Sequence, residues 1–467
     1  MTASKKKSAI DFTEGPILKK MLIFALPIIG NQLLQTLYNS ADMIVVGQWA
    51  PNGDIAMGAV GACGSLIRLF INLFFGIAAG VGICVAQKIG AKATQDVETY
   101  IHTSAVFSFF GGIALMIVGI LATEPLLLWT GVPESMLPDA SAYMRAYFIG
   151  IPAMMVLNFL SAALRASGDT IHVMIFMAIS GAANVLVNLV MVVGFGWGAA
   201  GVGLGTTVAQ TMAAVMIVVH MMRLDGMCRL SLKKLGMSFR ALADVIRNGL
   251  PVGLQSVVLS FSNIIVQTEI NSYGDIVISG MTAAANLEGY ISVAMNSVAV
   301  AVLTVISQNV GARKYRRVRD ILIRSALATA VIGIVVGVLM NIFADPLLML
   351  YRAGSDERSV AIREAGAVRL LIVCLPYFLC GVMGVLASAL KGMKRSITTM
   401  VITILGHCVF QILWIRLICP HFAGQLPVLL AVFPASWLLT SLLYTVFFIL
   451  EYRKHIKAQA PLCFAAL

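Results

Sequence analysis

The stretch "ALPIIGNQLLQTLYN" at residues 25–39 has a counterpart, "GLPVGLQSVVLSFSN", at residues 249–263. Both segments are apolar and carry proline at the third position, which aligns Pro27 with Pro251 at an offset of 224 residues. One such match occurs easily by chance, whereas matches that recur in the same order at nearly one offset indicate an internal repeat. The stretch therefore predicts that the second half of the chain repeats the first.

Other short segments repeat at nearly the same distance. Two pairs are offset by 221 residues and a third, weaker pair by 226. They are "AQKIGAK" (86–92) with "SQNVGAR" (307–313), "EPLLLWTG" (124–131) with "DPLLMLYR" (345–352), and "LRASGDT" (164–170) with "LKGMKRS" (390–396). The chain is therefore interpreted as two copies of one unit.

The amino-acid composition indicates the environment in which the chain folds. Of its 467 residues, 59% are hydrophobic and only 12% are charged, and the mean hydropathy is +0.92. Such a chain is typical of a membrane protein. A helix of about 20 apolar residues crosses the hydrocarbon core. Runs of this kind occur near 21–47, 57–86, 101–122, 143–163, 172–194, 199–222, 245–271, 277–307, 321–344, 365–390, 397–419 and 426–450.

The long, continuous runs favour helices over a transmembrane barrel, whose strands show short alternating segments. We expect an all-α integral membrane protein with twelve transmembrane helices in two six-helix repeats. Because each repeat has an even number of spans, the two copies enter the membrane in the same sense. The expected domains are an N-terminal lobe at 1–222, a cytoplasmic linker at 223–244 and a C-terminal lobe at 245–467.

The positive charge is distributed by topology and not gathered into a nucleic-acid-binding patch. The net charge is +12, and 26 of the 33 Lys and Arg residues fall on one side of the expected topology. That asymmetry predicts both termini in the cytoplasm of a multi-pass plasma-membrane protein. We expect no cleavable signal peptide. The eight scattered Cys residues predict neither a disulfide framework nor a metal site.

A polar stripe interrupts the first apolar run. Gln35, Tyr38, Asn39 and Asp42 follow the spacing i, i+3, i+4 and i+7, which places them on one face of a helix. An ionisable side chain exposed to lipid costs several kcal/mol, so the stripe is expected to face the bundle interior or a water-filled cavity. A cation or proton site is favoured over a helix-packing cluster, because amides alone suffice for packing.

Two later runs carry neutral oxygen and amide groups at one-turn spacing. The fifth run has Asn184 and Asn188, and the sixth has Thr206 and Gln210. One carboxylate among such groups can serve as a Na⁺ ligand or as a proton carrier, so Asp42 is a candidate for either role. Packing between helices is the alternative for the neutral groups.

The repeat is not symmetric in charge. The counterpart of Asp42 is Val266, so the N-terminal lobe is expected to hold the coupling site. In the other half, Glu288 lies well inside a span. It is either a contact for a cationic substrate or a buried, hydrogen-bonded acid.

Several spaced motifs together resemble one known family. "TEGPILKKMLIFALP", "YNSADMIVVG", "VAQKIGAK", "LRASGDT" and "SQNVGARKYRRV" occur in order along the chain. They are similar to those of the multidrug and toxic compound extrusion (MATE) family, and the resemblance covers essentially the whole chain. It implies a cation-coupled antiporter that exports organic, often cationic and amphipathic compounds against inward flow of H⁺ or Na⁺.

The resemblance also implies roles for single residues. Asp42 matches a coupling-site aspartate, and Pro27 matches a proline at which the first helix of some relatives bends. Positions that line the N-lobe pocket of relatives correspond here to Gln35, Tyr38, Asn158, Asn184, Asn188 and Thr206. The chain departs from one branch of the family, which has a second aspartate where this chain has Asn188. Another branch carries acids in the seventh and tenth helices, where this chain has Leu259 and no acid, so the coupling ion stays open.

Other function classes fit less well. A flippase for a lipid-linked anionic precursor is the alternative, but it needs several arginines in the cavity, and the candidates within spans or at their outer ends are Arg68 and Arg145. An enzyme is not expected, since no paired acids, metal cluster or nucleophile with its base is recognisable. The expected partners are small organic cations and the lipid bilayer, with no nucleic acid, no cofactor beyond the coupling ion and a monomeric chain.

Overall fold

The computed structural model describes residues 10–50, 53–351, 354–422 and 425–464, and within these ranges all regular structure is helical. Side chains at 53–55, 57, 62, 65, 68, 69 and 457–464 lie outside the description. Eleven of the described helices are long and apolar enough to cross a membrane, or twelve if one bent pair forms a single span. The all-helical membrane fold predicted from the sequence is therefore confirmed.

The fourth predicted span is broken. The sequence predicts one run over 143–163, whereas the structure has two helices, Leu137–Ile149 and Ile151–Ala166, bent by 46°. Pro152 lies in the first turn of the second helix, where its missing N–H costs nothing, but it cannot continue the hydrogen-bond ladder of the first. Gly150 sits between the two helices.

Within the described residues, the contacts divide the chain into two compact units. The first comprises Met1–Asp11 with Leu26–Gly253, and the second comprises Phe12–Ala25 with Leu254–Leu467. The expected lobes had a simpler order along the chain. The difference arises because two long helices, Ile17–Trp49 and Phe239–Asn271, are each shared between the units.

Both shared helices change units beside a proline. The first boundary falls between Ala25 and Leu26, next to Pro27, and the second follows Gly253, two residues after Pro251. These are the two prolines that the internal repeat aligns. The repeat is therefore visible in how its first helices are shared.

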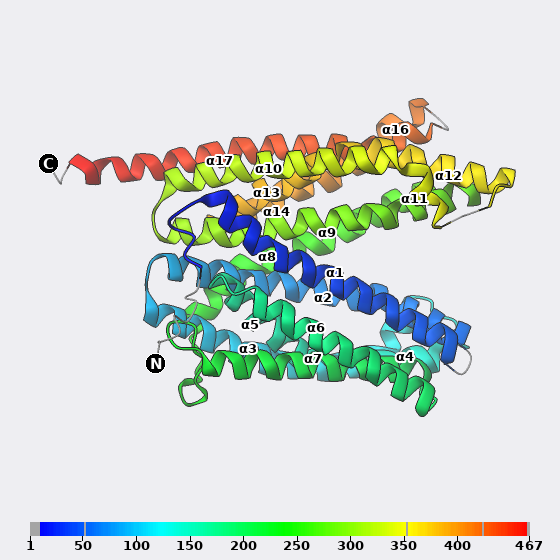
Figure 1. The fold of residues 1–467 in the computed structure, drawn as a ribbon, viewed down its shortest axis with the longest axis horizontal. Helices are drawn as coiled ribbons and strands as arrows, with labels where there is room; N and C mark the ends of the chain where they lie inside the picture. Colours follow the sequence, from blue (N-terminus) through cyan, green and yellow to red (C-terminus); the bar gives the residue numbers. More distant parts are fainter. Residues whose placement is uncertain (1–9, 51–52, 352–353, 423–424, 465–467) are drawn as a thin grey trace, which may run out of the picture. The chain divides into compact units, whose positions relative to one another are not determined.

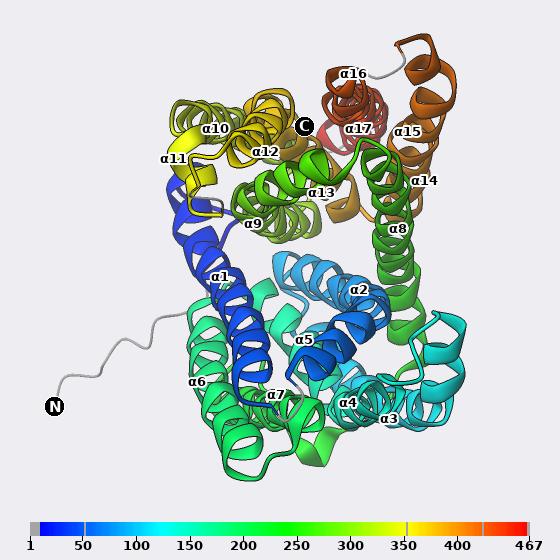
Figure 2. The same ribbon diagram turned by 90° about the vertical axis from the view of Figure 1, so that its right-hand side faces the viewer.

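The first unit is a bundle in which helices pack both on their neighbours in the chain and on helices further along it (Figures 1 and 2). Its pairs include α3 with α5, α2 with α5, α6 with α7 and α4 with α7. Its elements are most of α1 (Ile17–Trp49), α2 (Gly53–Gly90), α3 (Thr94–Trp129), α4 (Leu137–Ile149), α5 (Ile151–Ala166), α6 (Ile171–Asn188), the π-helical segment η1 (Leu189–Gly194), α7 (Gly198–Arg223), the 3₁₀ turn η2 (Leu232–Lys234) and the start of α8 (Phe239–Asn271).

Glycines let α2 and α8 approach closely in this unit. A Cβ on Gly76 would lie 2.0 Å from the Gly253 nitrogen, and a Cβ on Gly80 would lie 2.4 Å from the Val245 carbonyl oxygen. Gly249 makes the reciprocal approach to Ile77. Small residues at such spacing permit close helix packing in membranes, so "GIAAG" at 76–80 is a packing element.

In the second unit α13 packs on α9, α10 and α17, which run alongside it in Figure 1. Prolines and π-helical turns interrupt the spans that follow α12. The elements are the rest of α8, α9 (Asp275–Gly311), α10 (Tyr315–Ile342), α11 (Ala344–Met349), α12 (Glu357–Arg369), η3 (Leu370–Cys374), η4 (Leu375–Tyr377), α13 (Phe378–Gly392), α14 (Ser396–Thr403), η5 (Ile404–Val409), α15 (Phe410–Leu413), η6 (Trp414–Ile418), η7 (Cys419–Phe422), α16 (Leu426–Leu430) and α17 (Val432–Phe464).

The segment before α1 is fastened to the second unit by the "SQNVGARKYRRV" motif. The Phe12 backbone N–H donates to Gln308 Oε1 at 3.2 Å, and Asn309 Nδ2 donates to the Phe12 carbonyl at 3.2 Å. Arg317 Nη2 donates to the Gly15 carbonyl at 2.7 Å. One of the family-like motifs thus holds the N-terminal segment in place.

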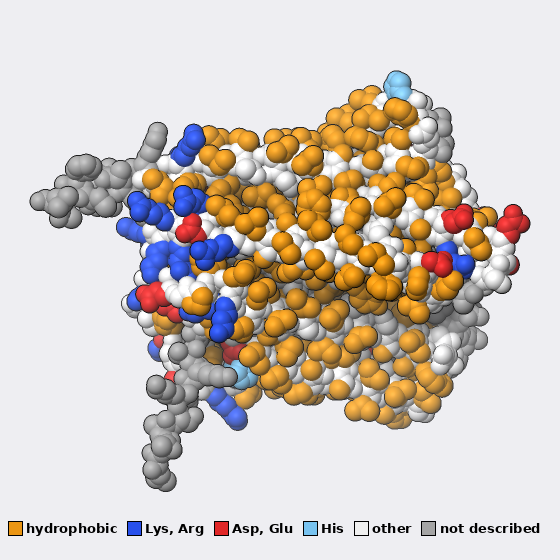
Figure 3. All heavy atoms as spheres, turned by 45° about the horizontal axis from the view of Figure 1, so that its top comes forward, with side chains coloured by type: hydrophobic (Ala, Val, Ile, Leu, Met, Phe, Trp, Pro, Cys, Tyr) orange, Lys and Arg blue, Asp and Glu red, His pale blue; other side chains and the backbone are white. Residues whose placement is uncertain are grey.

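Much of the described surface is apolar. On the face in Figure 3, hydrophobic side chains cover the helices along their length, and Lys and Arg side chains gather at one end. Leu327 and Val331 of α10, for example, are 62% and 60% exposed. Such a continuous apolar surface is expected where hydrocarbon replaces water.

The α2–α8 contact predicts the effect of adding one methyl group. Gly80→Ala places a Cβ against backbone atoms that cannot move aside, and overpacking of this kind costs about 1–3 kcal/mol. We expect a lower apparent melting temperature of the purified protein in detergent. Gly61→Ala, on the same helix with nothing within 4 Å of the added Cβ, is the matched control. Equal melting temperatures for both variants would contradict the packing.

Candidate functional site

Asp42 lies on α1 in the first unit and accepts a hydrogen bond from α6. Asn188 Nδ2 donates to Asp42 Oδ1 at 2.5 Å. Asn188 is fully buried and is the last residue of α6 before the backbone widens into η1. Turns of this π-helical type often accompany functional sites, because they re-aim a side chain without ending the helix.

Asn184, one turn earlier on α6, joins the same carboxylate. Amide orientation is assigned from the hydrogen-bond network. In the orientation that satisfies both ends, Asn184 Nδ2 donates to Asp42 Oδ1 at 2.8 Å, and its oxygen accepts from the Thr206 backbone N–H at 3.2 Å. The opposite orientation allows only a 3.4 Å contact with Asn188 Nδ2 and leaves the amide oxygen facing the carboxylate. The first orientation therefore describes the site.

The space for this arrangement comes from two glycines. A Cβ on Gly205 of α7 would lie 1.8 Å from Asn188 Oδ1. A Cβ on Gly181 of α6 would lie 1.8 Å from Cζ of Tyr38, whose hydroxyl donates to the Ala178 carbonyl at 3.2 Å. Because neither glycine has a side chain, Asn188 and Tyr38 can occupy this space and are held in position there.

The Asp42 carboxylate is held by neutral groups. Among the described residues, its hydrogen bonds come from two amides, and no Lys, Arg or His forms an ion pair with it. A carboxylate in apolar surroundings is stable only when it is paired with a cation, hydrogen-bonded or protonated. The arrangement thus leaves the negative charge available to a mobile cation or a proton.

Three other residues that the sequence predicted for this site form no side-chain hydrogen bond with Asp42 in the described part of the chain. Thr206 reaches the site through its backbone, while its hydroxyl donates to the Val202 carbonyl of its own helix at 3.1 Å. Asn158 Nδ2 likewise donates to the Met154 carbonyl at 2.8 Å. The Oε1 atom of Gln210 is buried without a partner among the described residues.

The other two members of the α1 stripe have no side-chain hydrogen bond to a described residue. Gln35 is half-buried and Asn39 is exposed. Of the four residues in the predicted stripe, Tyr38 and Asp42 therefore form hydrogen bonds with α6, and the other two do not.

Two tyrosines near the site were not singled out from the sequence. Tyr143 and Tyr147 of α4 have ring centroids 6.3 Å apart, and both lie within electrostatic range of Asp42. Thr207 Oγ1 of α7 donates to the Ala146 carbonyl at 2.7 Å and holds α4 in place. The spacing "YMRAY" was a usable signal, but one continuous fourth span concealed that α4 is a separate helix.

Pro27 lies inside α1, which is one helix from Ile17 to Trp49. Its ring removes the N–H that would bond to the Ile23 carbonyl, so the ladder has a gap there. The predicted bend at this residue stays a prediction. Pro27 lies two residues beyond the boundary between the units.

Glu288, in the second unit, is paired. Arg369 Nη2 and Nε donate to Glu288 Oε2 at 2.7 and 3.1 Å, and the guanidinium carbon lies 5.6 Å from the Phe433 ring centroid. The two side chains are only 16% and 8% exposed. Of the two readings left open by the sequence, this geometry favours the buried acid. The sequence analysis missed Arg369, although a charge within the predicted run 365–390 was a usable signal.

Of the two arginines that the sequence offered for anion binding, only Arg145 has a described side chain. Arg145 Nη2 pairs with Glu124 Oε1 at 2.6 Å, and both side chains are about half exposed. The side chain of Arg68 lies outside the described residues.

The chain matches the sequence pattern of a known protein family. A family model described as MatE matches residues 27–190 and again residues 251–415. The two matches cover more than half of the chain, and their starts are separated by the offset that aligns Pro27 with Pro251. The internal repeat is therefore confirmed by two copies of one family pattern.

Individual relatives agree with the family match. The chain is 24% identical over 396 residues to the probable multidrug resistance protein YoeA of Bacillus subtilis (strain 168), covering 83% of each chain. It is 23% identical over 410 residues to the multidrug export protein MepA of Staphylococcus aureus (strain MSSA476), covering 86% of this chain and 88% of that protein. A solved structure described as MATE in the bent conformation superposes with a TM-score of 0.87 at 19% identity, over 96% of this chain and 98% of that one.

The Glu288–Arg369 pair predicts a stability effect in the second unit. Arg369→Met leaves a carboxylate buried without its cation, which costs about 3–5 kcal/mol. We expect a marked fall in the apparent melting temperature of the purified protein. Adding Glu288→Gln to that variant removes the orphaned charge and should recover much of the loss. An unchanged melting temperature for Arg369→Met alone would show that the pair is not structural.

Proposed function

Because the chain belongs to the MATE family of multidrug efflux transporters, we propose that it exports organic, cationic, amphipathic compounds by antiport coupled to an inward cation. Members of this family are multi-pass membrane transporters and not enzymes. The substrate class, the coupling ion and the transport cycle are the parts proposed here.

One observation supports the coupling role above the others. Asp42 is a carboxylate inside an apolar bundle whose hydrogen-bond partners are neutral amides. A structural acid is normally neutralised by a fixed cation, as Glu288 is by Arg369. Since Asp42 has no such cation among the described residues, it suits reversible neutralisation by a transported one.

The amide orientation favours H⁺ over Na⁺ as the coupling ion. Asn184 and Asn188 both turn their nitrogen atoms toward Asp42, so their oxygens point away from the carboxylate. Na⁺ is a hard cation that needs several oxygen ligands, whereas a proton needs only the carboxylate. To bind Na⁺ between these groups, both amides would have to turn over.

Substrate and proton would then compete for one charge. The ionised carboxylate attracts a cationic compound. Protonation of Asp42 removes this attraction, and the compound is released. Exchange drives transport only if the two ligands favour different conformations, since a ligand shifts an equilibrium through its differential affinity. A monomer with two six-helix repeats suits alternating access by rocking of its halves.

Pro27 provides a place for one of these movements. α1 carries Asp42 and passes from the second unit to the first beside this proline. A relative of the same fold is described in a bent conformation. We propose that α1 of this chain bends at Pro27 during the cycle.

The distribution of basic residues supports an orientation in the plasma membrane. Lys and Arg gather in the N-terminal segment, in the connections that follow even-numbered spans and in the C-terminal tail. By the positive-inside rule, both termini lie in the cytoplasm and compounds leave toward the outside.

A lipid-precursor flippase is the weaker alternative. It requires free cationic groups in a cavity, but Arg369 is bound to Glu288 and Arg145 to Glu124. Neither of these two arginines is therefore free to bind an anionic precursor.

Asp42→Asn tests the coupling role directly. The substitution keeps the shape and an acceptor oxygen but cannot carry the charge or exchange the proton. We expect normal membrane expression and loss of efflux of a cationic dye from cells. Glu269→Gln, a second acid within a span, is the control and should export normally. Full dye export by Asp42→Asn would remove Asp42 from the mechanism.

Imposed gradients in proteoliposomes identify the ion. We expect a proton gradient to drive dye movement and a Na⁺ gradient at constant pH to leave it unchanged. Transport driven by Na⁺ alone would overturn the proton assignment while preserving the role of Asp42.

Gly205→Ala tests the amide geometry without touching a polar residue. The added Cβ displaces the Asn188 amide from Asp42, and a hydrogen bond to a charged group contributes about 1.5–3 kcal/mol, or about tenfold or more in an equilibrium. We expect dye efflux to fall by at least about tenfold. Gly194→Ala, with nothing within 4 Å of its Cβ, should keep efflux. Equal efflux in both variants would contradict a role for Asn188.

A further inference from the structure

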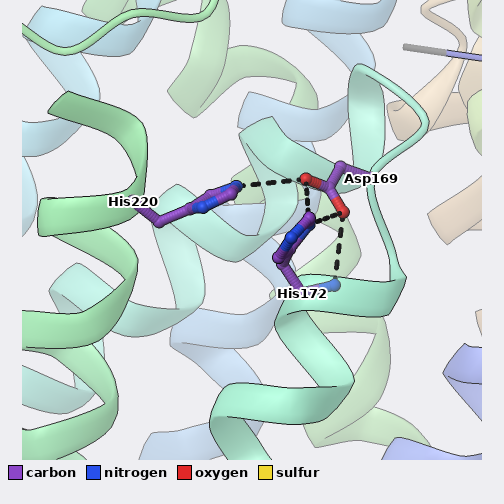
Figure 4. Close-up of side chains that lie close together, drawn as sticks. All are labelled: Asp169, His172 and His220. Carbon is purple, nitrogen blue, oxygen red and sulfur yellow. Dashed lines mark hydrogen bonds and ion pairs between the residues drawn. The ribbon is translucent and has the colours of Figure 1, made fainter. Parts of the chain in front are cut away.

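A second polar cluster lies in the first unit, outside the Asp42 site. Asp169 is in the turn between α5 and α6, His172 is in the first turn of α6, and His220 is in the last turn of α7. Figure 4 shows the two imidazole rings approaching the Asp169 carboxylate from two different helices. The transport mechanism proposed above uses none of these residues.

The distances within the cluster are short. His172 Nδ1 lies 2.8 Å from both carboxylate oxygens of Asp169, and His220 Nε2 lies 3.2 Å from Oδ2. One ligand atom from each of the three residues can be chosen so that all lie within 4.8 Å of one another. Ligand atoms held at about 2.1 Å around a tetrahedral metal ion lie roughly 3.4 Å apart. Small side-chain rotations would therefore admit an ion at the centre.

Local structure holds the three side chains in place. The His172 backbone N–H donates to Asp169 Oδ1 at 3.2 Å, so the carboxylate also caps the first turn of α6. The His172 and His220 rings lie 4.2 Å apart at an angle of 30°. Exposures of 48% for His172, 21% for Asp169 and 18% for His220 leave a path by which an ion can enter.

We propose that Asp169, His172 and His220 bind one divalent transition-metal ion, with Zn²⁺ as the preferred ion. Two imidazoles and one carboxylate suit Zn²⁺ and its neighbours, whereas Ca²⁺ and Mg²⁺ prefer oxygen ligands alone. Three protein ligands leave further coordination positions for water. Each imidazole nitrogen that ligates the metal must be free of its proton.

The bound ion would join α6 to α7 at the end of the bundle where the connection to α8 begins. Arg223 ends α7, only three residues beyond His220. Asp169 belongs to the "LRASGDT" motif, but both histidines lie outside it, so the site is a property of this chain's own residues. Metal binding would thereby restrain the α5–α6 turn and the start of the linker together.

The test uses the full-length protein, purified in detergent through a histidine-free tag and stripped with a chelator. Co²⁺ is titrated as a coloured substitute for Zn²⁺, and Zn²⁺ is then added as a competitor. We expect one Co²⁺ per chain, with visible absorption bands but no intense near-ultraviolet band from sulfur ligation, and complete displacement by Zn²⁺. A sulfur band would identify a cysteine site and overturn the assignment.

Matched variants identify the ligands. His172→Gln, His220→Gln and Asp169→Asn should each weaken Co²⁺ binding by more than about tenfold, the loss that removal of even a supporting group causes. His421→Gln, an exposed histidine elsewhere, should bind as the native chain does. Gel filtration and melting temperatures measured with chelator show whether each variant is folded. Binding that persists in folded His220→Gln, or no binding by the native chain at micromolar metal, would refute the site. Because binding is read without a transport assay, the result is independent of the proposed function.

Discussion

The hydrogen bond from Asn188 to Asp42 joins α1 to α6 inside an apolar bundle, and neighbouring features of the first unit make room for it. Gly205 leaves room for the Asn188 amide, and Gly181 leaves room for the Tyr38 ring on the same helix face. The π-helical turn η1 begins directly after Asn188. Since an unpaired carboxylate is costly in such surroundings, these features are best understood as conditions for keeping one charge partly satisfied. A fully satisfied carboxylate would have nothing left to exchange.

In the second unit, by contrast, the buried acid is paired with a fixed cation. Glu288 has a fixed guanidinium partner that also stacks on Phe433, and the position equivalent to Asp42 is the buried Val266. A buried ion pair holds both charges permanently, because removing either leaves the other uncompensated. Two copies of one fold thus carry different electrostatics: the acid of the first is held by neutral amides, and the acid of the second by a fixed cation. The repeat supplies the framework, and the individual substitutions decide where chemistry takes place.

The sequence was most informative where a physical period governs the structure. Span length predicted the helical membrane fold, and the 3.6-residue helical period placed Asn184 and Asn188 on one face. The family resemblance implied that these residues share a pocket with Asp42. It failed where the outcome depends on contacts between distant residues. No pattern links Glu288 to Arg369, 81 positions away, or His220 to Asp169, 51 positions away. The break at Gly150 was also missed, because the hydropathy is continuous across it. Pro152 lacks the backbone N–H that a continuous helix would need there.

The direction of an amide is a further property that sequence cannot give, and here it bears on the coupling ion. Asn184 and Asn188 have the same atoms whether nitrogen or oxygen faces the carboxylate, so composition alone fits Na⁺ and H⁺ equally. The choice is made by the surroundings: Asn184 accepts from the Thr206 backbone N–H and donates to Asp42 only when its nitrogen faces the carboxylate. A backbone group on α7 therefore fixes which end of an α6 side chain meets a charge on α1. Packing between helices, and not the inventory of polar residues, sets the chemistry of the site.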